Sequence, residues 1–150
     1  MFLYSPQNCN MKSIITIASE KDFPEIVRLA QSFDLDCENI AWNQFIVAKK
    51  NESIIGFGRL RAYSDCSEVA TVGVIKPERN KGIGTSIVKE LIRMGFGSKE
   101  IYVTCVIPNF FLRLGFETVK QYPALLQKKV DFCKLYDFTD EQIFVMKFVK

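Results

Sequence analysis

The residues best suited to chemistry lie in a basic, glycine-punctuated turn, residues 79–85, which joins a strand-like run at 72–74 to a helix. The first N–H groups of a helix have no internal partner and lie at the positive end of its dipole, so they stabilise an anion. Gly82 and Gly84 lack the Cβ atoms that would keep a phosphate away from those amides. Arg79 and Lys81 add positive charge beside them. The sequence therefore predicts a phosphate-binding turn.

Two common phosphate motifs do not describe this turn. A Walker loop needs GxxxxGK followed by Ser or Thr, and the sequence has no such run. A dinucleotide fingerprint needs GxGxxG, but Ile87 or Val88 stands where its third glycine would be. Residues 79–84 instead match RxxGxG, and farther along the chain residues 108–116 read Pro-Asn-Phe-Phe-Leu-Arg-Leu-Gly-Phe.

The two segments together resemble the two signatures of the GNAT superfamily of N-acetyltransferases. The first is the acyl-coenzyme A motif RxxGxG, and the second is a helix that carries Phe-Tyr-x-Lys-x-Gly-Phe after an Asn. The resemblance extends over nearly all of residues 11–150 and implies acetyl-coenzyme A (acetyl-CoA) as cosubstrate. The positions that it assigns to this cosubstrate are Val72, Gly73, Val74, Arg79, Asn80, Lys81, Gly82, Ile83, Gly84, Thr85, Asn109 and Phe111.

The pattern of apolar residues predicts the elements that position these segments. Strands are expected at 14–18, 45–49, 53–61, 68–74, 101–106, 116–119 and 143–149, where β-branched and aromatic residues cluster. Helices are expected at 23–33, from 83 to the glycines at 95 and 97, and at 109–114. Residues 120–141 are expected to be a long irregular excursion. This order is an α/β class fold, and the resemblance implies a mixed, mostly antiparallel sheet of six to seven strands, flanked by helices and splayed between the fourth and fifth strands.

The resemblance also implies how the chemistry proceeds. A neutral amine attacks the thioester carbon directly in a ternary complex, so that proximity lowers the barrier. A backbone N–H near residues 72–74 would polarise the thioester carbonyl. Counting back from RxxGxG, Glu68 aligns with the glutamate that histone acetyltransferases of the superfamily use as general base. The alternative is that Glu68 is a solvated strand-end residue and that a water chain removes the proton.

Phe111 departs from the family pattern. Relatives usually carry there a tyrosine that protonates the leaving thiolate, and phenylalanine has no proton to give. Tyr102, Cys105 and Tyr122 are candidate substitutes. Cys105 is alternatively an acyl-accepting nucleophile or a buried small hydrophobe. The missing acid also allows a second function, that of a non-catalytic acyl-CoA sensor or regulatory protein.

Two further segments bear on the acceptor, for which we expect a primary amine of a small molecule. Residues 34–39 form an acidic patch, which is either a solvated loop or short helix, or a lip that attracts a cationic amine. Residues 122–138 loosely resemble the tail of GNAT members that act on amino acids or similar small amines. Their aromatic density predicts packing, either onto this chain or across a homodimer.

Composition limits the organisation and the partners. A chain of 150 residues with 48% hydrophobic content can bury one substantial core, so we expect a single domain over 1–150, with 1–11 as a flexible N-terminal extension. The net charge of +3 is spread along the chain, which argues against a nucleic-acid-binding module built on Arg59, Arg61, Arg79 and Lys81.

The five cysteines are widely spaced and histidine is absent. Neither a metal site nor a disulfide framework is expected, and Ser-His and Cys-His catalytic pairs are excluded. The apolar residues 1–4 follow no basic segment and precede a polar run, which argues against a signal peptide or a membrane span. We therefore predict a reducing, cytoplasmic location and no membrane partner.

Overall fold

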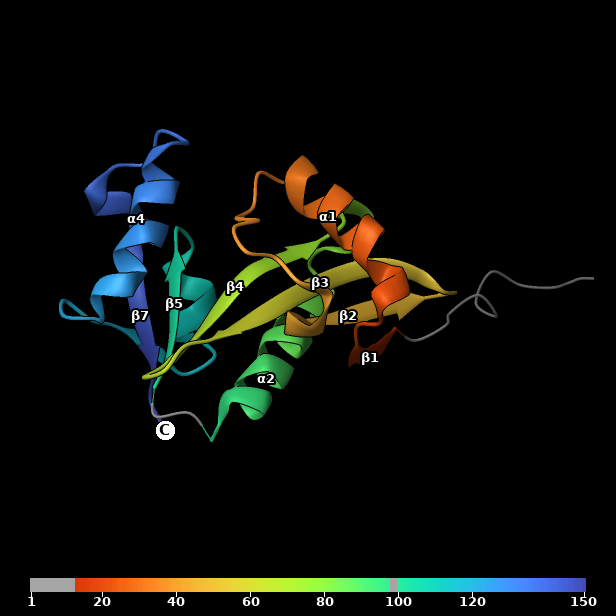
Figure 1. Cartoon of the computed structure of the whole chain (residues 1–150), viewed down its shortest axis with the longest axis horizontal. Helices are drawn as coiled ribbons and strands as arrows, with labels where there is room; N and C mark the ends of the chain where they lie inside the picture. Colours follow the sequence, from red (N-terminus) through yellow and green to blue (C-terminus); the bar gives the residue numbers. More distant parts are fainter. Residues whose placement is uncertain (1–12, 98–99) are drawn as a thin grey trace, which may run out of the picture.

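One sheet organises the protein (Figure 1). The computed structural model describes residues 13–97 and 100–150, so the predicted extension at 1–11 lies outside the described residues. The strands follow the order β1-β2-β3-β4-β5-β7-β6 across a seven-stranded sheet. Their bounds are β1 Ile14–Ile17, β2 Phe45–Lys50, β3 Ser53–Ala62, β4 Ser67–Val74, β5 Ile101–Cys105, β6 Phe116–Thr118 and β7 Phe144–Phe148.

Neighbouring strands of this sheet are antiparallel, except for the pair β4 and β5, which is parallel. The pair is parallel because helix α2 (Ile83–Gly95) carries the chain from the end of β4 back to the level at which β4 began, and β5 starts there. The predicted α/β class and the mixed, mostly antiparallel sheet are thus confirmed.

Strands β4 and β5 are paired only at their first residues. The register joins Ser67 to Ile101, Glu68 to Tyr102 and Val69 to Val103. Beyond Val69, β4 continues to Val74 without a partner on that side, and Figure 1 shows the two strands diverging. The splay between the fourth and fifth strands is therefore where the resemblance predicted it. It leaves backbone groups of β4 available to a ligand.

Helix α2 covers one face of the sheet, while α1 (Phe23–Ser32) and α4 (Gln127–Lys134) lie on the other (Figure 1). The apolar stripe of α2 packs into the main core through Ile87, Val88 and Leu91. Gly58 of β3 allows this close approach, since a Cβ there would lie 2.8 Å from Cγ2 of Ile87. A short helix, α3 (Pro108–Leu112), follows β5.

The expectation of an irregular segment at 120–141 is wrong, because this segment contains α4. Leu126 and Val130 are buried against Tyr102 of β5 and Val145 of β7, on one face of the sheet. The segment therefore packs onto its own chain, which was the first of the two predicted alternatives. Its sequence gave a weak helical signal because Val130 is the sole buried residue within the helix.

Candidate functional site

The predicted phosphate-binding turn opens α2 in a backbone conformation that only glycine adopts easily. Gly82 is the N-cap residue, with φ of +86°, and α2 begins at the next residue. The first hydrogen bond of the helix joins the Ser86 amide to the Gly82 carbonyl, at 3.0 Å. The amides before Ser86 in the first turn have no intrahelical acceptor and point out of the helix end. This end of α2 can therefore bind an anion.

The side chains of the turn differ in their placement. Lys81 is exposed and lies 3.4 Å from Glu78. Arg79 folds back, so that its Nε donates a 2.7 Å hydrogen bond to the Val74 carbonyl and its guanidinium lies 5.3 Å from the centre of the Phe33 ring. Arg79 thus occupies the last carbonyl of β4 and stands at the mouth of the splay.

A cavity of about 690 Å³ fills the splay between β4 and β5, and we call it the groove. Its lining is mostly apolar, which suits a thioester and its extended arm. The groove brings together six of the predicted cosubstrate residues: Val72, Gly73, Val74, Arg79, Gly84 and Phe111. The other predicted residues do not line it, and they are Asn80, Lys81, Gly82, Ile83, Thr85 and Asn109. All of these except Asn109, which is exposed on α3, belong to the turn or to the first turn of α2.

The side chains that line the groove and carry a proton that a thiolate could accept include Cys105, Cys133 and Tyr136. Phe111 is buried and packs edge to face against Phe110 and Phe116, with ring centres 5.0 and 5.5 Å away. Of the three candidate substitutes, only Cys105 lines the groove, since Tyr102 is buried under α4 and Tyr122 donates to Gln127 elsewhere. Burial raises the pKa of the Cys105 thiol to about 11. A thiol of that pKa is a poor nucleophile at neutral pH, so Cys105 fits the buried-hydrophobe alternative.

A bulge in β4 shapes the wall of the groove. Thr71 has φ of +53°, an outlying value for a β-branched residue, and the pairing of β3 with β4 shifts register opposite it. Two hydrogen bonds hold this conformation: the Thr71 hydroxyl donates to the Asp36 carbonyl at 2.8 Å and accepts from Nε of Arg59 at 2.8 Å. The conformation of the strand where the groove begins therefore depends on two residues outside the predicted site.

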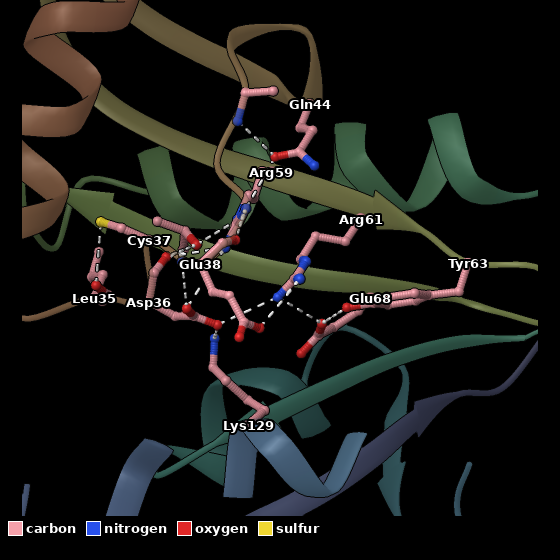
Figure 2. Close-up of polar contacts among 12 residues, drawn as sticks. Leu35, Asp36, Cys37, Glu38, Gln44, Arg59, Arg61, Tyr63, Glu68 and Lys129 are labelled. Atoms are coloured by element: carbon pink, nitrogen blue, oxygen red, sulfur yellow. Dashed lines mark hydrogen bonds and ion pairs between the residues drawn. The ribbon is translucent and has the colours of Figure 1, made fainter. Parts of the chain in front are cut away.

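Asp36 is the centre of a buried charge cluster that also contains Arg59, Arg61 and Lys129 (Figure 2). Its carboxylate oxygens lie 3.3 Å from Nζ of Lys129, 3.5 Å from Arg61 and 3.9 Å from Arg59. Burial by itself would raise the pKa of the Asp36 carboxyl, but the Lys129 charge, the Glu38 amide and the Arg59 charge together lower it. A solvated loop at 34–39 is therefore the wrong expectation for Asp36, which is 6% exposed.

Arg59 is the other unexpected member of the cluster. It is fully buried, and its guanidinium donates to the carbonyls of Asp36 and Glu38, to the side chain of Gln44 and to Thr71, at 2.8 to 3.1 Å. These bonds tie the loop after α1 to β3 and β4. Arg59 and Arg61 could have been found in the sequence as two arginines on one face of an otherwise apolar strand.

A second cavity, of about 450 Å³, lies beside the groove, and we call it the charged pocket. Asp36, Lys129 and Phe132 line both cavities, so the two meet at these side chains. The charged pocket also has Arg61, Tyr63 and Glu68 in its wall. A ligand in the groove and a ligand in the charged pocket can therefore lie in contact.

Glu68 is 1% exposed, so the alternative of a solvated strand-end glutamate is wrong. Its Oε1 accepts a 3.0 Å hydrogen bond from the Tyr63 hydroxyl and lies 3.9 Å from Nη1 of Arg61. Its Oε2 has no hydrogen-bond partner among the described residues. A buried carboxylate oxygen without a donor is costly, so this atom favours a ligand that brings a proton or an N–H group.

The comparison with known families decides the relationship. The profile of the acetyltransferase (GNAT) family matches residues 12–116, which is more than half of the chain. The chain belongs to this family. The groove and the turn contain most of the residues that the resemblance to this family assigned to acetyl-CoA. No curated protein matches the chain by sequence.

Solved structures of similar fold share little sequence with this GNAT protein. Rv2747 from Mycobacterium tuberculosis, solved with CoA and a second ligand, is 21% identical, has a TM-score of 0.71 and matches over 91% of this chain and 99% of its own. A GNAT acetyltransferase from Staphylococcus aureus is 19% identical, with a TM-score of 0.67 and coverage of 91% and 98%.

N-acetylglutamate synthase from Neisseria gonorrhoeae, solved with CoA and N-acetyl-glutamate, is 16% identical, with a TM-score of 0.72. The match covers 91% of this chain but 34% of the synthase. At these identities the three structures show a common fold.

The described residues contain neither a metal-binding cluster nor a membrane-spanning helix. Across 13–97 and 100–150, no group of three or more His, Cys, Asp or Glu side chains is arranged to hold a metal ion. Within the same ranges, every helix is too short or too polar to span a bilayer.

Proposed function

We propose that this GNAT protein transfers the acetyl group of acetyl-CoA to a primary amine of a small molecule, by direct attack in a ternary complex. The observation that carries the proposal is the contact between the groove and the charged pocket at Asp36, Lys129 and Phe132. One cavity suits a thioester and the other suits a polar acceptor, so the two reactants can meet without a covalent enzyme intermediate.

For acetyl-CoA, the proposal assigns the pyrophosphate to the first amides of α2, with Arg79 and Lys81 beside them. The arm would enter the groove along residues 72–74 of β4, whose edge is unpaired with β5 there. Arg79 must release the Val74 carbonyl for this, because its hydrogen bond occupies that group in the free protein. Phe111, which lines the groove, and Asn109, which is exposed on α3, complete the assignment.

In the chemical step, the acceptor must lose a proton to become a neutral amine. Glu68 can take this proton on Oε2, the buried oxygen without a partner. The amine nitrogen then bonds to the thioester carbon, and a backbone N–H near Val72 stabilises the oxyanion. The C–S bond breaks with its electron pair on sulfur, the new amide nitrogen releases its extra proton to solvent, and solvent protonates the thiolate. Phe111 supplies no proton to the thiolate, which can leave unaided because it is a tolerable leaving group near neutral pH.

Phe111 also favours a second candidate, a non-catalytic acyl-CoA sensor that retains the groove without the acid. The two candidates differ in turnover. Release of free thiol from acetyl-CoA, measured across a panel of small primary amines, supports the transferase. Stoichiometric binding of acetyl-CoA without thiol release from any amine supports the sensor.

The role of Glu68 is tested by Glu68→Gln, which keeps the size of the side chain. We expect it to lower kcat/KM by about 10² to 10⁴-fold, the usual contribution of general acid–base catalysis. Glu117→Gln, on the exposed side of β6, is the matched control. If the two variants are equally active and both are folded, a water chain and not Glu68 removes the proton.

A further inference from the structure

Arg61 is a buried cation that uses few of its hydrogen-bond donors. Its side chain is 11% exposed, and its nearest carboxylate oxygens are those of Asp36, Glu38 and Glu68, at 3.5, 3.7 and 3.9 Å. Among the described residues, only the Asp36 contact is a hydrogen bond, and it is at the upper limit of distance. A guanidinium carries five N–H groups, so most of those of Arg61 are free to bind a ligand in the charged pocket.

Arg59 provides the comparison within the same strand. It lies two residues before Arg61, on the same face of β3, and makes hydrogen bonds of 2.8 to 3.1 Å to four different residues. Its donors are used by the fold itself. Arg59 is thus a structural arginine, whereas the donors of Arg61 remain available in the wall of a cavity.

The charges that line the charged pocket are mixed in sign. Its cations are Arg61, Lys128 and Lys129, and its carboxylates are those of Asp36, Glu38, Glu68 and Asp131. The third carboxylate near Arg61 belongs to Glu38, whose side chain is 50% exposed, so water screens it. A carboxylate ligand would therefore be bound by the local donors of Arg61 and Lys129, and not by an overall positive charge of the pocket.

We infer that the acceptor is an amino-carboxylate, such as a free amino acid, whose carboxylate is bound by Arg61. This inference rests on the proposed acetyl transfer and specifies its acceptor. An arginine can bind a carboxylate through two parallel hydrogen bonds, and Lys129 lies in the same wall to add a third charge contact. The acceptor's amine then lies toward Oε2 of Glu68.

The register of the sheet gives this arrangement its spacing. Arg61 and Glu68 are directly opposite each other on β3 and β4. A binder of carboxylate and a binder of ammonium therefore stand side by side, which matches a molecule that carries both groups close together. The rest of the acceptor would lie against Leu125, Phe132 and Leu135, the apolar part of the pocket.

The test compares three acceptors with the same side chain: phenylalanine, phenylalaninamide and phenethylamine. Thiol release is measured with wild-type protein at saturating acetyl-CoA. We expect kcat/KM for phenylalanine to exceed that for the two carboxylate-free amines by about 10- to 100-fold, the usual effect of hydrogen bonds to a charged group. Leucine, leucinamide and isoamylamine form a second set.

Variants of Arg61 test the assigned side chain. Arg61→Gln should reduce the preference for the free amino acid to a few-fold at most, and Arg61→Lys, which keeps the charge but loses the planar pair of donors, should fall between it and wild type. Arg93→Gln, an exposed arginine paired with Glu90 on α2, is the control and should keep the full preference.

Three results would overturn the inference. The first is equal kcat/KM for the free amino acids and their carboxylate-free analogues in wild type, which would reject the carboxylate site but leave the proposed acetyl transfer intact. An equal loss with all acceptors in Arg61→Gln would make Arg61 structural. If no amine is acetylated, calorimetry of phenylalanine and leucine with the CoA-bound protein decides: binding that Arg61→Gln abolishes supports the inference, and absence of binding in wild type rejects it.

Discussion

Replacing Asp36 with Asn removes one charge from the centre of the buried cluster and hardly changes the shape of the side chain. The Glu38 amide can still donate to Oδ1, so the turn after Asp36 is expected to persist. Three cations, Arg59, Arg61 and Lys129, would lose the carboxylate that they share. The substitution therefore isolates the electrostatic contribution of Asp36.

The expected loss follows from the burial of these groups. Breaking a buried ion pair by removing one partner costs about 3 to 5 kcal/mol. Arg61 and Lys129 retain some contact with water, at 11% and 12% exposure, so we expect the lower end, about 3 kcal/mol. In a chain of this size, each kcal/mol lowers the Tm by about 2 to 4 °C, so the Tm of Asp36→Asn should fall by about 6 to 12 °C.

The pH dependence of this loss in stability is a second, independent test of the role of Asp36. The pKa of Asp36 is lowered in the folded protein, so its contribution is complete above the ordinary carboxyl pKa of about 4 and is lost as the pH falls below it. The difference in free energy of unfolding between wild type and Asp36→Asn should therefore be constant from pH 7 to 5 and shrink toward pH 3. Urea unfolding at a series of pH values measures it.

Asp34→Asn is the matched control, because Asp34 is exposed, lies in the same loop and has a φ of +56° that asparagine tolerates. We expect it to change stability by less than about 0.5 kcal/mol. A loss below about 1 kcal/mol in Asp36→Asn, or a loss of the same size at pH 3 as at pH 7, would refute the reasoning.

Three further predictions concern the helix α2 and the groove. Gly82→Ala should lower the free energy of unfolding by about 1 to 2 kcal/mol, because the φ of Gly82 is positive. The control is Gly97→Ala, whose Cβ also meets open space and which should unfold at nearly the wild-type temperature. Equal melting temperatures of the two variants would contradict this prediction. Gly58→Ala should cost about 1 to 3 kcal/mol in urea unfolding, since its Cβ would lie 2.8 Å from Ile87, and an unchanged midpoint would show that α2 shifts freely. Labelling of Cys105 by iodoacetamide, followed by mass spectrometry, should be slow at pH 7 and rise as the pH approaches about 11; fast labelling at pH 7 would contradict the burial of this thiol.

The parts of the fold that depend on local pattern could be predicted from the sequence. Alternation and apolar runs located the strands, and the stripe of Ile87, Val88 and Leu91 located the face of α2 that packs on the sheet. The turn at 79–85 was recognisable because its glycines and basic residues are adjacent in the chain. The resemblance, which rests on this turn and on residues 108–116, supplied the splay that the structure has.

The charged pocket was predicted only in part, through Glu68 and the possible acidic lip at 34–39, because its other residues come from distant parts of the chain. Asp36 looked like part of an exposed acidic loop, since its burial depends on Arg59 and Lys129, which lie 23 and 93 residues away. The sequence of the β3–β4 hairpin did contain one indication of the pocket. Pairing the strands through their turn places Arg61 opposite Glu68, and this cross-strand pair marks the pocket.

The measurement that tests the central claim most directly is thermal unfolding of the protein with and without acetyl-CoA, beside a variant that carries both Arg79→Glu and Gly82→Glu. Acetyl-CoA at about 100 times its Kd should stabilise the wild type by about 2.7 kcal/mol and leave the variant's Tm unchanged. That pair of results places the cosubstrate at the start of α2. An unchanged wild-type Tm would contradict the account, because the turn would then be a structural helix start that binds no acetyl-CoA.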